Sequence, residues 1–232
     1  MVEIYAVKIP EYITGLQFSR LTQYVDLQKK ERIKRFVKVE DAYRTLIADI
    51  LLRSLICEKF GIINHDIIFN VTEYGKPYLK NVEQLSYNIS HSGDWVVIAL
   101  NNFEIGIDIE MIKPIDFNFA KQFLTEYEYF DLMSIQEKRK RLEYFYDLWT
   151  LKESYVKAIG KGLFFPLKDF TIQKDSLNKI TFQSSLDTNS WYFKQYEVDH
   201  DYKLSVCSEI NSFPNFPIIK KFSNLCQEIE NY

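Results

Sequence analysis

The chain has 232 residues, of which 47% are hydrophobic and 26% charged, and its formal net charge is −3. This composition predicts a folded globular protein rather than a disordered one, with enough length for one large domain or two small ones. The acidic balance argues against a general nucleic-acid-binding protein, although it leaves room for a local basic patch.

The cysteines and the apolar runs indicate the cellular compartment in which the protein works. Cys57, Cys207 and Cys226 are odd in number and lack metal-ligand spacing, which fits free thiols in a reducing cytosol. The N-terminus lacks the basic and apolar regions of a signal peptide, and the apolar run 95–100 is too short to span a bilayer. We therefore expect a cytoplasmic protein without a membrane segment.

A strand at 2–9, a basic helix at 26–36 and a long amphipathic helix at 41–60 ending at Gly61 are predicted first. Arg44 lies near the start of the long helix. The basic helix carries Lys29, Lys30, Arg32, Lys34 and Arg35. Such a run can be an ordinary solvated helix face, but in an acidic protein it also indicates an anion site.

Strands at 67–71, 85–89 and 95–100 follow, separated by two polar turns. The turns contain Glu73-Tyr74-Gly75-Lys76-Pro77 and Ser90-His91-Ser92-Gly93. His91 fits either a hydrogen-bonded turn histidine or a phosphate contact flanked by hydroxyl groups.

The stretch Ile105–Glu110 alternates between apolar and polar residues. In a β-strand its isoleucines can enter a core while Asp108 and Glu110 share the opposite face. Two carboxylates this close repel unless a cation lies between them, and a divalent ion held by oxygens is the usual solution. A half-buried strand with a solvated polar face is the alternative.

Helices at 117–134 and 137–159 come next, the second ending at Gly160-Lys161-Gly162. Its Glu153 and Lys157 are four residues apart and therefore neighbours on the helix surface. They form either an ordinary salt bridge, or a third ligand of the ion together with a cation for the anion that the ion holds. Strands are predicted at 170–173, 179–183, 191–197 and 203–207, and Pro214 and Pro217 leave the tail without a pattern.

The order of elements repeats within the chain: a long helix, a strand and a later strand run occur in both halves. We predict an α+β (α/β) fold with two similar pseudo-symmetric halves, each with a sheet packed against a long helix and with a ligand cleft between them. The expected units are an N-terminal half at 1–104, a C-terminal half at 105–211 and a tail at 212–232.

Four motifs occur in an order that resembles the Sfp-type 4′-phosphopantetheinyl transferases. They are Gly75-Lys76-Pro77, Asn88-Ile89-Ser90-His91-Ser92, Gly106-Ile107-Asp108-Ile109-Glu110 and Trp149-Thr150-Leu151-Lys152-Glu153-Ser154-Tyr155-Val156-Lys157-Ala158. The resemblance implies coenzyme A and Mg²⁺ in the cleft, with Asp108, Glu110 and Glu153 as metal ligands.

The same resemblance implies the residues that bind coenzyme A. They are Lys29, Arg32, Arg44, Lys76, Pro77, Ser90, His91, Lys152 and Lys157. Spacing alone leaves open which cations of the basic helix contact phosphate. Glu153 and Lys157 are the expected catalytic pair, and Glu153, Glu128 or a metal-bound water accepts the serine proton, with Glu153 favoured.

The implied function is transfer of 4′-phosphopantetheine from coenzyme A to a serine of an apo carrier protein of a peptide, polyketide or fatty acid synthase. The expected partners are coenzyme A and the carrier, without nucleic acid or membrane, and the expected state is a functional monomer. A magnesium-dependent nuclease and a non-catalytic coenzyme A-binding protein are the alternatives.

Overall fold

The computed structural model describes residues 1–80, 82, 84–162, 165–175 and 179–232. Up to residue 101 the elements are β1 (Glu3–Lys8), α1 (Gly15–Leu21), η1 (Thr22–Tyr24), α2 (Leu27–Lys34), α3 (Val39–Phe60), η2 (Asn64–Asp66), β2 (Phe69–Val71), β3 (Pro77–Leu79), β4 (Ser86–Ser92) and β5 (Trp95–Asn101). They are followed by β6 (Ile105–Met111), α4 (Phe117–Ala120), α5 (Glu126–Ser134), α6 (Lys138–Ile159), η4 (Leu167–Asp169), β7 (Phe170–Lys174), β8 (Ile180–Ser184), β9 (Tyr192–Tyr196), β10 (Tyr202–Ser208), β11 (Ile218–Lys220) and α7 (Phe222–Glu230).

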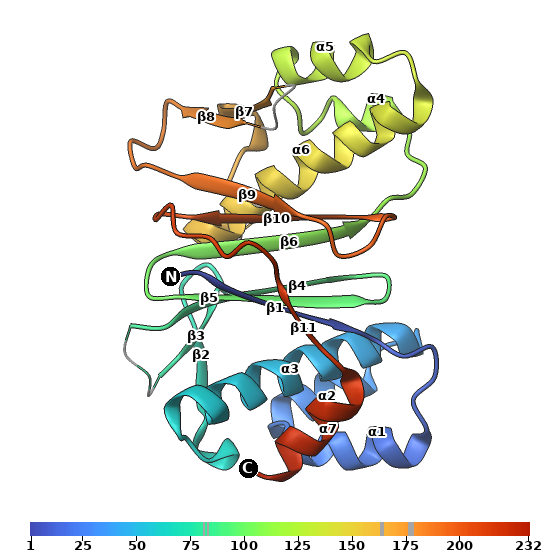
Figure 1. The fold of residues 1–232 in the computed structure, drawn as a ribbon, viewed down its shortest axis with the longest axis vertical. Helices are drawn as coiled ribbons and strands as arrows, with labels where there is room; N and C mark the ends of the chain where they lie inside the picture. The colour runs from blue at the N-terminus through green and yellow to red at the C-terminus, as the bar shows by residue number, and fades with distance from the viewer. Residues whose placement is uncertain (81, 83, 163–164, 176–178) are drawn as a thin grey trace.

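Two sheets lie face to face at the centre of the molecule, with helices on both outer sides (Figure 1). Their strand orders are β11-β1-β5-β4 and β6-β10-β9. The order β1-β5-β4 matches β6-β10-β9, and each set is joined through one long helix and one small hairpin: α3 with β2–β3, and α6 with β7–β8. The predicted α+β class with two halves is confirmed, and their pseudo-symmetry stays a prediction.

Strand β6 is buried on both faces, and its alternating side chains meet a different neighbour on each face. Ile105, Ile107 and Ile109 enter the core between the two sheets, where they meet Val97 and Ala99 of β5. The opposite face packs against α6, and Gly106 makes this close contact possible because it has no side chain. The expected alternation is therefore confirmed, but the polar face is covered by a helix rather than by solvent.

The two long helices end as predicted. Gly61 follows α3 with φ 65°, and Gly160 follows α6 with φ 69°, both in the left-handed region that glycine adopts most easily. Each glycine amide donates to the carbonyl four residues earlier, Cys57 and Val156 respectively, which satisfies one carbonyl at each helix end.

Two predicted boundaries are wrong. The helix expected at 117–134 is divided into α4 and α5, because Thr125 forms a capping box with Glu128 and starts a new helix. Ser90, His91 and Ser92 belong to strand β4 rather than to a turn, and the turn is confined to Gly93 and Asp94.

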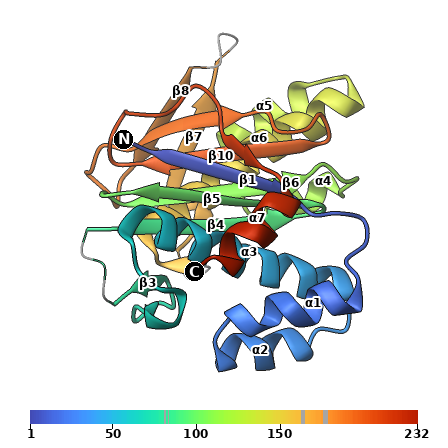
Figure 2. The same cartoon turned by 60° about the horizontal axis from the view of Figure 1, so that its bottom comes forward.

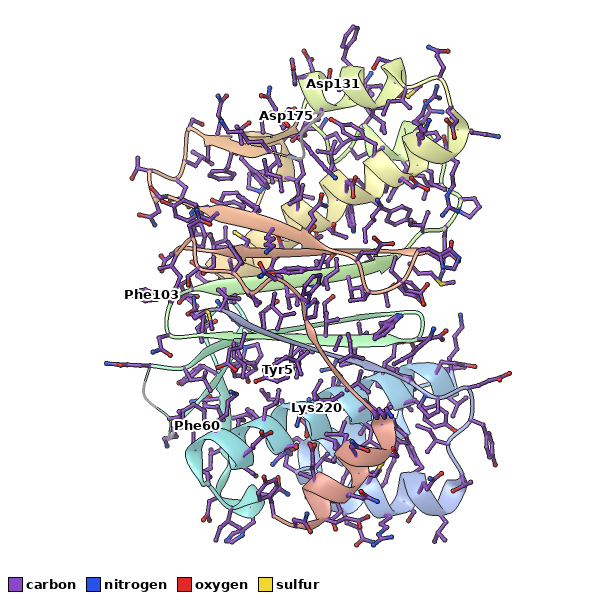
Figure 3. The ribbon with its side chains drawn as sticks, viewed as in Figure 1. Tyr5, Phe60, Phe103, Asp131, Asp175 and Lys220 are labelled. Atoms are coloured by element: carbon purple, nitrogen blue, oxygen red, sulfur yellow. The ribbon has the colours of Figure 1, made fainter. Side chains whose placement is uncertain are left out.

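The tail and one early helix were missed. Helix α1 follows Thr14, whose side chain caps it. Strand β11 pairs in parallel with β1, and α7 lies against α3 (Figure 2). Figure 3 shows Tyr5 on the helix-facing side of β1 and Lys220 at the junction with α7, where its ammonium group contacts Glu58 and Glu228.

Replacing Gly106 with alanine should lower the free energy of unfolding by at least about 2 kcal/mol, because the added methyl group would overlap the carbonyl oxygen of Ser154 and the amide nitrogen of Ala158. Urea denaturation measures this change. Gly15→Ala is the matched control, since nothing lies within 4 Å of the added carbon, and it should change stability by less than about 1 kcal/mol. Equal stability of the two variants would contradict the close strand–helix contact.

Candidate active site

Asp108 and Glu110 lie on the face of β6 that packs against α6, Asp108 buried and Glu110 half-buried. Asp108 Oδ1 accepts hydrogen bonds from Lys157 Nζ at 2.6 Å and Ser90 Oγ at 2.9 Å. Glu110 Oε2 accepts one from Ser92 Oγ at 2.7 Å. Burial raises the pKa of both carboxyl groups, and the charge of Asp108 raises the pKa of Glu110 further.

Glu153 brings a third carboxylate from α6. Burial raises the pKa of Glu153 to about 7, and the charge of Asp108 adds to the shift while Lys157 opposes it. Glu153 Oε1 and Asp108 Oδ2 are buried and have no hydrogen-bond partner among the residues described. Such atoms are costly to bury, so this carboxylate group lacks part of its counter-charge.

Lys157 forms its ion pair with Asp108 of β6 rather than with its helix neighbour Glu153. Its ammonium group contacts Asp108 and also donates to Ser90 Oγ at 3.0 Å. The interpretation of Glu153 and Lys157 as an ordinary surface salt bridge is therefore wrong. Lys157 instead joins α6 to β6 and β4.

A cleft of about 380 Å³ opens between the elements of the two halves. The carboxylates and Lys157 come from β6 and α6, whereas α2, α3 and β4 supply the remaining wall. Its lining residues are Lys29, Arg32, Thr45, Ala48, Ile89, Ser90, His91, Asp108, Glu110, Trp149, Glu153 and Lys157. The predicted cleft between halves is present, with anionic and cationic walls.

Helix α2 presents two of its cations to this cleft. Lys29 and Arg32 are three residues apart and therefore share one side of the helix. Lys30 and Lys34 line a separate, mainly apolar hollow with Ile33. The structure thus shows which basic residues of α2 line the cleft, a question that spacing alone left open.

Ion pairs to two buried residues of α3 hold α2 in place. Arg53 and Asp49 of α3 are each 3% exposed and contact one another at 2.9 Å. Arg53 also contacts Asp26, which caps α2, at 3.0 Å, and Lys29 Nζ lies 3.4 Å from Asp49 Oδ1. The position of Lys29 is consequently set by charges inside the helical layer.

Two sequence profiles match most of the chain: that of the 4′-phosphopantetheinyl transferase superfamily at residues 104–207, and that of the 4′-phosphopantetheinyl transferase N-terminal region at residues 14–102. The 4′-phosphopantetheinyl transferases ffp of Bacillus subtilis and Sfp of Bacillus subtilis strain 168 are both 38% identical to it, over 91% and 93% of this chain and 94% of each relative. That of Aneurinibacillus migulanus, gsp, is 37% identical over 97% of this chain and 94% of the relative. The chain belongs to the 4′-phosphopantetheinyl transferase family.

In this family member, Arg44 does not line the cleft but lies near His91, which does. The Arg44 guanidinium group donates to Gly93 O at 2.8 Å and pairs with Asp41. Surrounding protein atoms lower the pKa of His91, and the charges of Arg44, Lys157 and Arg32 lower it further. The lowered pKa favours the neutral form of His91.

Lys76 and Pro77 do not line the cleft described above. Lys76 Nζ contacts Glu104 and donates to Ala158 O at 2.7 Å, so it ties the β2–β3 hairpin to the end of α6. Pro77 is exposed at the start of β3. Their predicted contact with coenzyme A stays a prediction.

Lys152 lies outside the cleft, on the other side of α6. It is fully buried and contacts Glu128 Oε1 at 2.9 Å. Its ammonium group also donates to the carbonyl oxygens of Leu167 and Phe170. Glu128 accepts the amides of Thr125 and Ile172. Both side chains are saturated by internal partners, so this geometry does not support Lys152 as a coenzyme A ligand or Glu128 as a base.

Sequence reasoning missed four lining residues, Thr45, Ala48, Ile89 and Trp149. Three of them are apolar and were indistinguishable from core positions. Trp149 begins the last of the four sequence motifs, where its helical spacing predicts a core position. Its ring does contact Phe145 and Phe123, at centroid distances of 6.0 and 5.0 Å. It serves both the core and the cleft wall.

Within the described residues, no three His, Cys, Asp or Glu side chains are grouped so that they could hold a metal ion. The set Asp108, Glu110 and Glu153 therefore stays a prediction. The described helices include none with the length and apolar character needed to cross a membrane.

Lys152→Met should lower the free energy of unfolding by about 3–5 kcal/mol, because it leaves Glu128 as an unpaired buried charge. Urea denaturation provides the measurement. The double variant Lys152→Met/Glu128→Gln should recover part of the loss, since no charge is then stranded. A loss of coenzyme A affinity at unchanged stability would instead restore the sequence-based assignment.

Proposed function

We propose that this protein transfers the 4′-phosphopantetheine group of coenzyme A to a serine of an apo carrier protein and releases 3′,5′-ADP. Membership of the family supports this reaction. The observation that carries it is the cleft, in which a group of carboxylates on β6 and α6 faces cations on α2. All of these side chains come from one chain, which supports a functional monomer.

The cations of the cleft suit a ligand with several phosphates. Lys29, Arg32 and Lys157 line the space as cations, and His91 lines it as a further hydrogen-bonding side chain. Charge-assisted hydrogen bonds from these groups would offset the phosphate charges, which otherwise repel an incoming nucleophile and the carboxylates. Lys157 already pairs with Asp108, so it can stay beside the carboxylates while it contacts the diphosphate.

The carboxylates fit a divalent cation. Asp108 Oδ2 and Glu153 Oε1 are buried oxygens without a donor among the described residues, and burial together with the charge of Asp108 raises the pKa of Glu153. Asp108, Glu110 and Glu153 would hold Mg²⁺ after moving together around it. When bound, Mg²⁺ supplies charge neutralisation for the diphosphate and its leaving group.

Glu153 is the proposed proton acceptor. In the reaction the serine oxygen forms a bond to the phosphorus nearest the pantetheine, the bond from that phosphorus to 3′,5′-ADP breaks, and the serine proton passes to Glu153. Glu153 lines the cleft, and its buried Oε1 has no donor among the described residues, so this oxygen can accept the proton. Lys157 would supply a positive charge next to the departing 3′,5′-ADP.

The test is incubation with coenzyme A, Mg²⁺ and a panel of apo carriers from peptide, polyketide and fatty acid synthases, read by intact mass. At least one carrier should gain the phosphopantetheine mass, and a carrier with its serine replaced by alanine should gain none. Cleavage of a phosphodiester without carrier modification would favour the nuclease. Binding of coenzyme A without any transfer would favour the non-catalytic protein.

Glu153→Gln should lower turnover by at least about a hundredfold, because the amide can neither accept the serine proton nor supply the ligand charge. The melting temperature should change little, since the shape is kept. Glu143→Gln on the same helix is the matched control: Glu143 pairs with Arg139 outside the cleft, so transfer should proceed at the wild-type rate. Normal transfer by Glu153→Gln would remove Glu153 from the mechanism.

Replacing Lys29 or Arg32 with methionine should weaken coenzyme A binding by about 1–3 kcal/mol for each lost charged contact. Lys30→Met on the other side of the same helix should have little effect, because Lys30 lines the separate hollow. Calorimetry with coenzyme A and dephospho-coenzyme A tells which phosphate is contacted, since a 3′-phosphate contact affects coenzyme A alone. An equal loss of coenzyme A affinity in Lys30→Met would indicate that the positive charge of α2 acts non-specifically.

Mg²⁺ affinity should weaken as the pH falls through about 7. The pKa of Glu153 lies near 7 in the metal-free protein, so below that pH the ion must displace a proton from Glu153 and above it need not. Tryptophan fluorescence can follow the titration because Trp149 lines the cleft. In Glu153→Gln the residual affinity should lose this pH dependence; an unchanged profile would assign the proton to another group.

A further inference from the structure

Strands β4 and β6 belong to different sheets, yet they run side by side. Three backbone amides of β6 donate to side-chain oxygens of β4, whereas in a regular sheet they would donate to backbone carbonyl groups of the neighbouring strand. Ile107 N lies 3.0 Å from Asn88 Oδ1, Ile109 N lies 3.3 Å from Ser90 Oγ and Met111 N lies 3.1 Å from Ser92 Oγ. Both series advance by two residues, as the alternation of side chains along a strand requires.

The two serines have a second role, because a hydroxyl group can donate while it accepts. Ser90 Oγ donates to Asp108 and Ser92 Oγ donates to Glu110. Each serine therefore joins a carboxylate of β6 to the amide of the next residue. Ser-x-Ser on β4 thus matches Asp-x-Glu on β6, and Asn88 accepts the amide that follows Gly106, where β6 has no side chain.

We propose that Ser92 is a positioning residue for Glu110. Its hydroxyl group donates to one carboxylate oxygen of Glu110 and accepts from the Met111 amide, and so fixes this carboxylate relative to the β6 backbone. The inference rests on the proposed function, in which Glu110 helps to hold Mg²⁺. Hydrogen-bond partners of metal-binding carboxylates typically alter metal affinity by 10–100-fold when they are removed.

The variants Ser92→Ala and Ser92→Thr separate positioning from simple packing. Ser92→Ala should raise the dissociation constant for Mg²⁺ about 10–100-fold, measured through tryptophan emission. Ser92→Thr retains the hydroxyl group in a residue that strands tolerate well, so its affinity should stay close to wild type. In the metal-free protein, hydrogen exchange at the Met111 amide should accelerate in Ser92→Ala and be restored in Ser92→Thr.

Ser208→Ala is the matched control. Ser208 is a fully buried serine that links the two sheets by accepting from Asn101 Nδ2 at 3.0 Å, and it contacts no carboxylate of the cleft. This change should lower the urea midpoint and leave Mg²⁺ affinity unchanged. Weaker Mg²⁺ binding in Ser92→Ala but not in Ser208→Ala supports the proposal.

The failures are distinguishable. If wild-type protein binds Mg²⁺ and Ser92→Ala binds it equally well, the positioning role is overturned while the proposed function stands. If wild-type protein shows no Mg²⁺ response, the proposed metal site is overturned and this inference with it. If Ser92→Ala loses affinity for metal-free coenzyme A but not for Mg²⁺, Ser92 contacts the phosphate and the positioning role is overturned.

Discussion

Strand β6 is covered on both faces, and this double burial determines the chemistry of the site. Its isoleucines are held between the sheets, so its other face must meet α6, and Gly106 lets the helix approach closely. Asp108 is thereby buried next to the helix, where an ionised carboxylate is stable only with donors and a counter-charge. Lys157 supplies part of that charge. Among the described residues, Asp108 Oδ2 and Glu153 Oε1 have no donor, which is the physical reason to expect a cation there.

The charges of the cleft are assembled only when the two halves pack together. The carboxylates belong to β6 and α6, whereas Lys29 and Arg32 belong to α2 in the other half. Helix α2 has its own internal support, because the buried Arg53 contacts its capping residue Asp26. Its cations therefore keep their place although their side chains reach solvent. A phosphate-bearing ligand would lie between two walls of opposite charge, each fixed by a different part of the core.

Much of this site could be read from the sequence, and the misses have physical causes. Alternation along β6 placed Asp108 and Glu110 together, but only long-range packing decides that Lys157 pairs with Asp108 rather than with Glu153. The helical repeat could have excluded Lys152 from the residues that face the cleft, because five residues along a helix place it about 140° from Lys157. A capping box was also readable at the start of α5. By contrast, β11 forms through pairing with a strand some 210 residues earlier, and no local pattern reports such a contact.

The two halves repeat an order of elements, but equivalent positions on their long helices have different contacts, and the C-terminal segment explains the difference. Helices α3 and α6 both have 22 residues and both end at a left-handed glycine, so Glu153 and Lys157 correspond to Ser54 and Glu58. Those two side chains contact the tail: Ser54 Oγ donates to Glu228 and Glu58 pairs with Lys220. The positions that carry charge into the cleft in one half thus bind β11 and α7 in the other. The same helix geometry lines the cleft in one half and packs against the tail in the other.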